Sequence, residues 1–310
     1  MELRHLRYFA AIVEAGGVSR AAAHLRMTQP ALGRQVRDLE RELGVRLFDR
    51  VGRRVQLTGE GEDLLRRCRV LLADAESLIE RGRALASGTT GVLRVGSTPH
   101  TLEAVLTPFV PRFRRSHPGV DVHFSEDGGM RLLDHLDRGQ FHLAVTGFVN
   151  ERFASRPLFP AVATAVMPAT HSLAKRRTLD VTDLAELPLL LLRRDFGTRQ
   201  WFDAACQVDR LRPRVLLESA APQTLVALAE IGYGVAVVPS NMVLRRGVRA
   251  SPLMHRGVVI GGWLSASWHP RRFLPPYAEA FIDELARFAR RSYPGRDVVR
   301  RAPPLTSPGR

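Results

Sequence analysis

Near its N-terminus the chain carries amide and guanidinium side chains at helical spacing. Gln29, Arg34 and Arg37 fall on the polar side of a helix predicted to begin after Thr28. A glutamine amide can pair with the edge of adenine, and a guanidinium can pair with guanine or a phosphate. The pattern therefore predicts a surface that contacts double-stranded DNA, with the expected members Ser19, Thr28, Gln29, Pro30, Gly33, Arg34 and Arg37. A small helical bundle with a solvated charged face is the alternative that spacing alone leaves open.

The familiar catalytic signatures are absent from the sequence. It contains no Gly-x-Ser-x-Gly elbow, no Gly-x-x-x-x-Gly-Lys loop and no His-Glu-x-x-His helix, and its ten histidines are scattered. Gly232-Tyr233-Gly234 lies between a predicted helix and a strand, whereas a dinucleotide loop joins a strand to a helix. We therefore expect no enzyme, no cofactor and no metal site. A redox role for Cys206 stays open as an alternative, although no second cysteine lies nearby to resolve a sulfenic acid.

The composition favours an intracellular protein of two or three globular units. The 310 residues are 45% hydrophobic but contain no run approaching 18 apolar residues and no cleavable apolar leader, so we expect a cytoplasmic protein with no membrane partner. Cys68 and Cys206 are too few for a disulfide framework. The net charge of +15 is weak support for DNA binding, because the excess is spread along the chain.

Three predicted helices position the polar face. The first is amphipathic and ends at Gly16-Gly17, and the second covers residues 20–25 with Ser19 as its expected cap. The third has Thr28 as its N-cap and ends at Gly44. Its buried side is expected to consist of Leu32, Val36, Leu39 and Leu43. This order of helices is that of a helix-turn-helix.

A basic hairpin is predicted directly after these helices. Short strands at 45–48 and 55–57 flank a tip over 50–54 that is rich in arginine. Such a hairpin can act as a wing, and we expect Arg53 and Arg54 to contact the DNA backbone.

Thr58 is then expected to cap a long helix with a 3.5-residue apolar repeat. A helix with this repeat needs a partner helix. We therefore expect it to form a dimer through Leu64, Cys68, Leu71, Ala75, Leu78 and Leu85. Packing of this helix against the chain's own second domain is the alternative.

From Gly91 onward strands alternate with helices, which predicts an α/β unit with a parallel sheet. Its strands are expected at 92–96, 120–124 and 141–145. A second unit is expected to begin near 163–167, with a helix over 180–187, strands at 189–192, 215–217 and 235–238, and a helix over 224–231. The last helix is expected over 277–290, and the tail 293–310, rich in arginine and proline, is expected to be disordered.

Several short motifs in the first 58 residues form one larger pattern with the start of the long helix. They are Leu3-Arg4-His5-Leu6-Arg7-Tyr8-Phe9, Ser19-Arg20-Ala21-Ala22, Thr28-Gln29-Pro30-Ala31-Leu32, Leu43-Gly44-Val45-Arg46-Leu47-Phe48, and Leu57-Thr58 with Gly61. With these motifs, residues 1–58 resemble the winged helix-turn-helix of LysR-type transcriptional regulators. Gly33 stands where the family usually has a serine, and His142 where it commonly has an acidic residue.

The resemblance extends to about residue 292 and implies a domain organisation. Residues 59–90 correspond to the linker and dimerisation helix, and 91–292 to an effector-binding domain similar to type II periplasmic solute-binding proteins. One lobe of that α/β domain covers about 91–162 and 267–292, and the other about 163–266.

In such a fold a small ligand is expected between the lobes, near strand ends and helix N-termini. Hydroxyls and backbone N–H groups there can bind an anion, and Arg199 is expected to clamp a carboxylate. The expected effector-binding residues are Ser97, Thr98, His100, Thr101, Thr146, Phe196, Thr198 and Arg199. Alternatively, Ser97 and Thr98 only cap their helix and Arg199 is solvated.

The resemblance implies a regulator that binds operator DNA as a dimer or a dimer of dimers. Its effector is expected to be a small organic acid or an aromatic compound, and RNA polymerase is a further partner if the protein is an activator. Two other classes stay open. A solute-binding protein would leave residues 1–58 unexplained, and a nucleoid protein would show no preference among duplexes.

Overall fold

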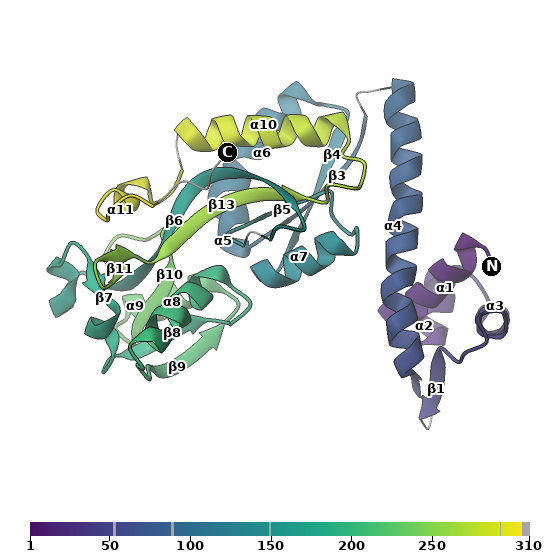
Figure 1. Cartoon of the computed structure of the whole chain (residues 1–310), viewed down its shortest axis with the longest axis horizontal. Coiled ribbons are helices and arrows are strands. Elements are labelled where there is room, and N and C mark those ends of the chain that lie inside the picture. Colours follow the sequence, from purple (N-terminus) through teal and green to yellow (C-terminus); the bar gives the residue numbers. More distant parts are fainter. Residues whose placement is uncertain (52–53, 88–89, 149, 292, 306–310) are drawn as a thin grey trace. The chain divides into compact units, whose positions relative to one another are not determined.

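The computed structural model describes residues 1–51, 54–87, 90–148, 150–291 and 293–305 (Figure 1). The chain divides into two compact units, one containing Met1–Gly82 and the other containing most of the remainder. Among the helices in these ranges, none combines the length and apolar character that a bilayer crossing requires.

The first unit is a winged helix-turn-helix. Thr28 caps α3 as predicted, because its Oγ1 accepts a hydrogen bond from the Ala31 N–H (3.4 Å), and Gly44 ends the helix at a φ of +72°. Thr58 caps α4, since its Oγ1 accepts from the Gly61 N–H (2.9 Å). The elements are α1 (Leu3–Glu14), α2 (Val18–His24), α3 (Gln29–Leu43), the antiparallel strands β1 (Phe48–Val51) and β2 (Arg54–Leu57), and α4 (Gly59–Ser87).

Two local predictions in this unit are wrong. Gly17 is the N-cap residue of α2, so Ser19 lies inside the helix and does not cap it. The strand predicted over 45–48 begins only at Phe48. The N–H groups of Leu47 and Phe48 instead donate to Glu40 Oε1 of α3 (2.8 and 3.3 Å), which ties the start of the hairpin to that helix.

The inner face of α3 is almost completely buried. Leu32, Val36 and Leu39 are each at most 6% exposed. Leu39 packs with apolar residues of α1 and with Leu65 and Cys68 of α4, while Leu32 and Val36 pack with residues of α1 and α2. This burial fixes the rotation of α3 about its axis, so that its polar face meets solvent.

The first turns of α4 belong to the same core, which corrects part of the predicted dimer seam. Cys68 is 3% exposed and its thiol donates to the Leu6 carbonyl (3.4 Å), and Leu64 packs against the same cluster. Both residues are therefore used within their own chain. Among the other predicted seam positions, Leu71 and Leu78 are exposed, Ala75 is half-buried, and the side chain of Leu85 lies outside the described part of the structure.

The second unit is built on an 11-stranded mixed sheet, and the three strands predicted to form a parallel set do so within it. One parallel set consists of β3 (Gly91–Ser97), β4 (Val120–Glu126) and β5 (Leu143–Thr146). A second parallel set consists of β8 (Pro188–Leu192), β9 (Arg214–Ser219) and β10 (Val235–Pro239). The long strands β6 (Ala154–Pro168) and β13 (Gly261–Trp268) run antiparallel to each other and join the two sets into two lobes. The remaining strands are β7 (Leu179–Asp180), β11 (Val248–His255) and β12 (Val258–Val259).

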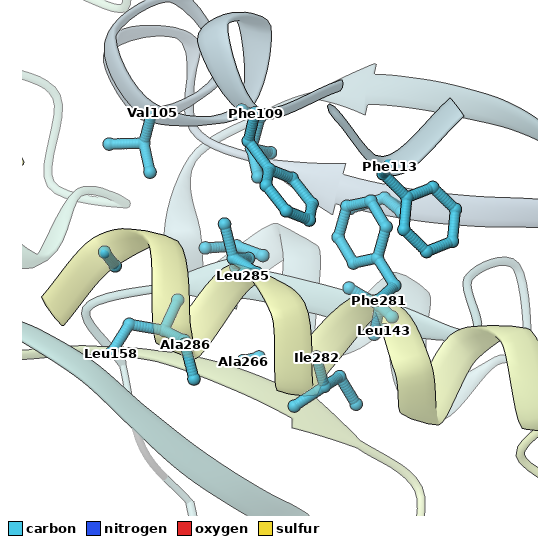
Figure 2. Packing of buried hydrophobic residues seen from close by; sticks show 14 of the residues in the cluster. Val105, Phe109, Phe113, Leu143, Leu158, Ala266, Phe281, Ile282, Leu285 and Ala286 are labelled. Atoms are coloured by element: carbon cyan, nitrogen blue, oxygen red, sulfur yellow. The ribbon is translucent and has the colours of Figure 1, made fainter. Parts of the chain in front are cut away.

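Helices cover each parallel set. In the first lobe, the rings of Phe109 and Phe113 lie 5.0 and 4.9 Å from the ring of Phe281, centroid to centroid. The helix α10 (Pro276–Arg291), which carries Phe281, therefore closes the core that the first strands begin (Figure 2). The helix predicted over 180–187 is only a 3-10 turn, Val181–Leu184. The helices of the first lobe are α5 (Pro99–Thr101), a π-helical turn (Leu102–Leu106), α6 (Thr107–Ser116), α7 (Gly129–Asp137) and α10 (Pro276–Arg291); those of the second are α8 (Gly197–Val208) and α9 (Pro222–Glu230).

The C-terminal segment 293–305 packs against the second unit, and the predicted disorder of this part is wrong. Tyr293 stacks on Phe159 with ring centroids 4.6 Å apart. After the short helix α11 (Arg296–Val299), Arg301 donates to the Ala250 carbonyl (3.2 Å). The apolar residues spaced among the arginines and prolines cover an apolar cluster of the second lobe; these residues are Val299, Ala302 and Leu305.

Gly295 provides a test of this packing. Its φ is +79°, and a Cβ there would collide with the Ser240 carbonyl oxygen, whereas Gly257 has a φ of +80° and no neighbour within 4 Å of its Cβ position. Both Gly→Ala changes cost about 1 kcal/mol of backbone strain. We expect Gly295→Ala to lower the melting temperature by at least about 4 °C more than Gly257→Ala. Equal melting temperatures would contradict the packing of this segment.

Candidate nucleic-acid interface and ligand cavity

The outward face of the helix-turn-helix gathers most of the predicted DNA-facing residues. Ser19, at the exposed side of α2, donates its hydroxyl to Gln29 Oε1 (3.2 Å) and so holds the first side chain of α3. Gly33 is half-buried. The exposed members of the predicted set are Ser19, Thr28, Gln29, Pro30, Arg34 and Arg37.

Arg34 and Arg37 are the cations best placed for anion binding on this face. Within the described residues, neither guanidinium is bonded to another protein group, whereas Arg41 one turn later pairs with Asp38 (3.0 Å). Arginine side chains left exposed on a helix with a solvent-facing polar side have the chemistry needed for phosphates and guanine edges. Of the predicted wing contacts, Arg53 and the side chain of Arg54 lie outside the described part of the structure.

A small cavity of about 20 Å³ lies between the two lobes of the second unit. Thr98 and His100 reach it from α5 and its N-terminal side, Thr146 from the end of β5, and Phe196 and Thr198 from the start of α8. Five of the eight predicted effector-binding residues thus line one space. Ser97 and Thr101 are fully buried but are not among the lining residues.

The predicted carboxylate clamp is wrong for Arg199. This side chain is 4% exposed and lies outside the cavity lining. Its Nε donates to Asp203 (2.8 Å), and its Nη1 donates to Glu218 (2.7 Å) and the Leu192 carbonyl (2.8 Å). Arg199 therefore joins α8 to β8 and β9, and its charge is already balanced by two carboxylates.

Seven of the lining residues were not predicted from the sequence, and those with an aromatic or polar side chain are Trp201 and Asn241. Trp201 lies one turn after Thr198 on α8, so helical spacing could have indicated it. Asn241 is 1% exposed and follows the carboxyl end of β10, where ligand-binding residues of α/β folds are common. The polar residues that follow this strand in the sequence could therefore have been predicted to line the cavity.

His100 is held neutral by its surroundings. It is 6% exposed, and burial lowers the pKa of its imidazole from 6.5 to about 3. Its Nε2 lies 3.3 Å from Thr98 Oγ1, whereas its Nδ1 is buried and, among the described residues, has no hydrogen-bond partner. The ring therefore takes part in hydrogen bonds as an uncharged group.

Both cysteines are buried. Burial, and next the charge of Asp203, raise the pKa of the Cys206 thiol to about 11; burial raises the pKa of the Cys68 thiol to about 11 as well. Each thiol is thus protonated at neutral pH, and thiolate is the form that peroxides and alkylating reagents attack.

Comparison with known proteins agrees with this two-part organisation. Residues 3–62 match the model of the "Bacterial regulatory helix-turn-helix protein, lysR family", and residues 86–290 match that of the "LysR substrate binding domain". The transcriptional regulator AlsR of Bacillus subtilis is 30% identical over 250 residues, which are 78% of this chain and 81% of AlsR. A Streptomyces viridosporus protein described as "Probable hydrogen peroxide-inducible genes activator" is 34% identical over 260 residues, 81% of this chain and 82% of the other.

Solved structures of full-length regulators share the fold. CbnR, a LysR family transcriptional regulator, has a TM-score of 0.67 at 23% identity, covering 93% of this chain and 99% of CbnR. A full-length OxyR variant from Pseudomonas aeruginosa has a TM-score of 0.65 at 26% identity, covering 94% of this chain and 95% of the OxyR chain.

A winged helix-turn-helix followed by a two-lobed domain, together with the matched family models, defines a DNA-binding transcriptional regulator with an effector-binding domain. The chain belongs to the LysR family of such regulators, which are not enzymes.

Gly33 destabilises α3, and replacing it with a better helix former should stabilise the first unit. A Cβ at this position meets only the end of the Arg37 side chain, at 3.6 Å, an ordinary contact. Because serine is the better helix former, we expect Gly33→Ser to raise the free energy of unfolding of the first unit by about 0.5 kcal/mol. Chemical denaturation measures this, and binding to the promoter duplex should persist. Loss of that binding would contradict the accommodation of a side chain here.

His100 makes stability depend on pH. The unfolded chain binds a proton at this residue near pH 6.5, whereas the folded chain does so only near pH 3, so its contribution to stability is lost as pH falls through this window. Between pH 7 and pH 5 this loss is about 2 kcal/mol. His100→Gln should reduce the fall in unfolding free energy by that amount, with His24→Gln, at an exposed site, as control. An unchanged fall would refute burial of a neutral imidazole.

Cys206 should be inert in the folded protein. Titration with a thiol reagent at pH 7.5 is expected to detect neither cysteine until urea unfolds the chain, because both thiols are buried and protonated. Fast modification in the native state that disappears in Cys206→Ala would support the redox alternative instead.

Proposed function

We propose that this regulator binds operator DNA in its own promoter through α3, acting as a dimer or a dimer of dimers in the cytoplasm. Gln29, Arg34 and Arg37 read the base edges of the major groove, and Arg53 and Arg54 contact the backbone. The observation that carries this proposal is the pair of exposed guanidinium groups, Arg34 and Arg37, opposite the buried side of α3. The likeness to a structure of full-length CbnR complexed with its target DNA gives further support.

The dimer is proposed to form through the exposed part of α4. Leu71 and Leu78 are one heptad apart and are 48% and 72% exposed, and Ile79 beside them is 48% exposed. Large apolar side chains at this spacing favour a partner helix. Two recognition helices held in this way can meet two half-sites of one operator.

A small molecule is proposed to act on this assembly through the cavity between the lobes. As it stands, the cavity of about 20 Å³ has room for about one water molecule, so an effector requires the lobes or their side chains to move apart. An effector that binds only the more open arrangement shifts the population of regulators toward it. If the protein is an activator, RNA polymerase is the further partner.

The cavity lining supports only one of the two effector classes expected. Phe196 and Trp201 offer apolar aromatic surfaces suited to a planar compound. An organic acid has less support, because the lining residues are all uncharged and Arg199 is used elsewhere.

A mobility-shift titration tests whether Arg34 contacts base edges. Arg34→Ala should reduce affinity for a duplex from the promoter about 10- to 100-fold and bring it closer to that for a scrambled duplex. Arg41→Ala on the same helix, which removes an arginine already paired with Asp38, is the matched control and should change little. Retained preference in Arg34→Ala would contradict base reading by this residue.

The salt dependence of DNA affinity tests the proposed backbone contacts of the wing. Arg53→Ala should weaken binding to promoter and scrambled duplexes alike and reduce the slope of log affinity against log salt by about 1. A selective loss on the promoter duplex would instead assign this residue to base reading.

A further inference from the structure

Asn241 and His100 both line the cavity, and each has one buried polar atom without a hydrogen-bond partner among the described residues. Asn241 Oδ1 and His100 Nδ1 are buried and, among the described residues, bonded to no protein group, although both residues are more than nine-tenths buried. An unsatisfied polar group in such a place is costly. A ligand that completes these bonds would therefore gain affinity.

A chain of hydrogen bonds fixes what kind of atom His100 offers. The Thr98 hydroxyl donates its one hydrogen to Thr101 Oγ1 (2.9 Å). In this arrangement its oxygen accepts from His100 Nε2, 3.3 Å away, which requires the tautomer that carries the ring proton on Nε2. Since the imidazole is neutral, Nδ1 is an acceptor.

Asn241 is oriented by the same chain. Its Nδ2 donates to Thr101 Oγ1 (3.3 Å), which leaves the carbonyl oxygen Oδ1 as the open atom. Both unpartnered atoms are therefore hydrogen-bond acceptors.

The charged side chains near these residues also disfavour an anionic ligand. Pro99, between Thr98 and His100 in the sequence, borders a larger hollow of about 520 Å³ whose charged lining residues are Glu103 and Glu126. The guanidinium of Arg199 is balanced by two carboxylates outside the cavity. A carboxylate ligand would face two acceptors, and Arg199 would not balance its charge.

We infer that the effector presents hydroxyl or amino donors to Asn241 Oδ1 and His100 Nδ1 and is neutral or cationic, an alcohol or an amine, not a carboxylic acid. This inference rests on the proposed role of the cavity as the effector site. The aromatic walls Phe196 and Trp201 accommodate the apolar part of such a molecule.

Matched probes test the inference on the full-length chain. Benzyl alcohol, benzylamine and benzoate share a ring and differ in the group offered to the two acceptors. At millimolar concentration the first two should raise the melting temperature and benzoate should not. A larger rise with benzoate, or no rise with either donor, would overturn the inference.

Variants of Asn241 assign the response to the cavity. Asn241→Leu should weaken the response to both donors about ten-fold. Asn241→Asp keeps an acceptor, adds a negative charge, and should favour benzylamine over benzyl alcohol. Unchanged responses in both variants would place the probes elsewhere and refute the site. Failure of the unsubstituted chain to shift its promoter duplex would refute DNA binding while leaving these results interpretable.

The tautomer of His100 is a second, ligand-free test. Nitrogen-15 NMR of the histidine rings, with His100→Gln for assignment, should show His100 neutral and protonated on Nε2 at pH 6 to 8. Protonation on Nδ1 would make that atom a donor and contradict the inference.

Discussion

The burial of one side of α3 is the constraint on which the DNA-binding unit depends. Leu32, Val36 and Leu39 are held by apolar residues of α1 and α2, and Leu39 also by the first turns of α4. Removing one such leucine side chain typically costs about 2–5 kcal/mol, so the helix has little freedom to rotate. The side that carries Gln29, Arg34 and Arg37 is exposed as a consequence. Leu65 and Cys68 of α4 belong to the same core as Leu39 of α3. A displacement of α4 would therefore change the contacts that hold α3.

The second unit contains the corresponding constraint on the lobes. Thr101 of the first lobe accepts a hydrogen bond from Asn241 of the second, and Gln223 of α9 donates to Glu103 across the same boundary. These contacts hold an arrangement whose cavity admits about one water molecule. A larger ligand would need the lobes or their side chains to move apart, and its donors would then meet the unpartnered acceptor atoms of Asn241 and His100. Such a ligand would bind the open arrangement of the lobes more tightly than the closed one, and this difference in affinity is what an effector needs.

Local signals in the sequence predicted what local contacts determine. The N-cap Thr28 and the left-handed Gly44 depend on neighbours within a few residues, and the helical spacing of apolar residues marked the buried side of α3. The errors arose where distant residues decide. Arg199 meets Glu218 on another strand, Cys68 meets Leu6 on another helix, and the chain after Tyr293 finds its apolar partners in β6, β11 and β12. Five cavity residues were predictable from strand ends and helix starts, whereas the acceptor chemistry of the site required the partners of Thr101.

Site-directed DNA cleavage tests most directly whether α3 lies on DNA. Cys68 and Cys206 are buried, so Asp38→Cys, at an exposed position of α3, introduces a reactive thiol to which an iron chelate can be attached. On the promoter duplex, the chelate should cut within a few base pairs of each half-site, at major-groove positions, and should give no focused cuts on a scrambled duplex. Binding of the promoter with uniform cutting, or with none, would contradict the placement of α3 against the DNA.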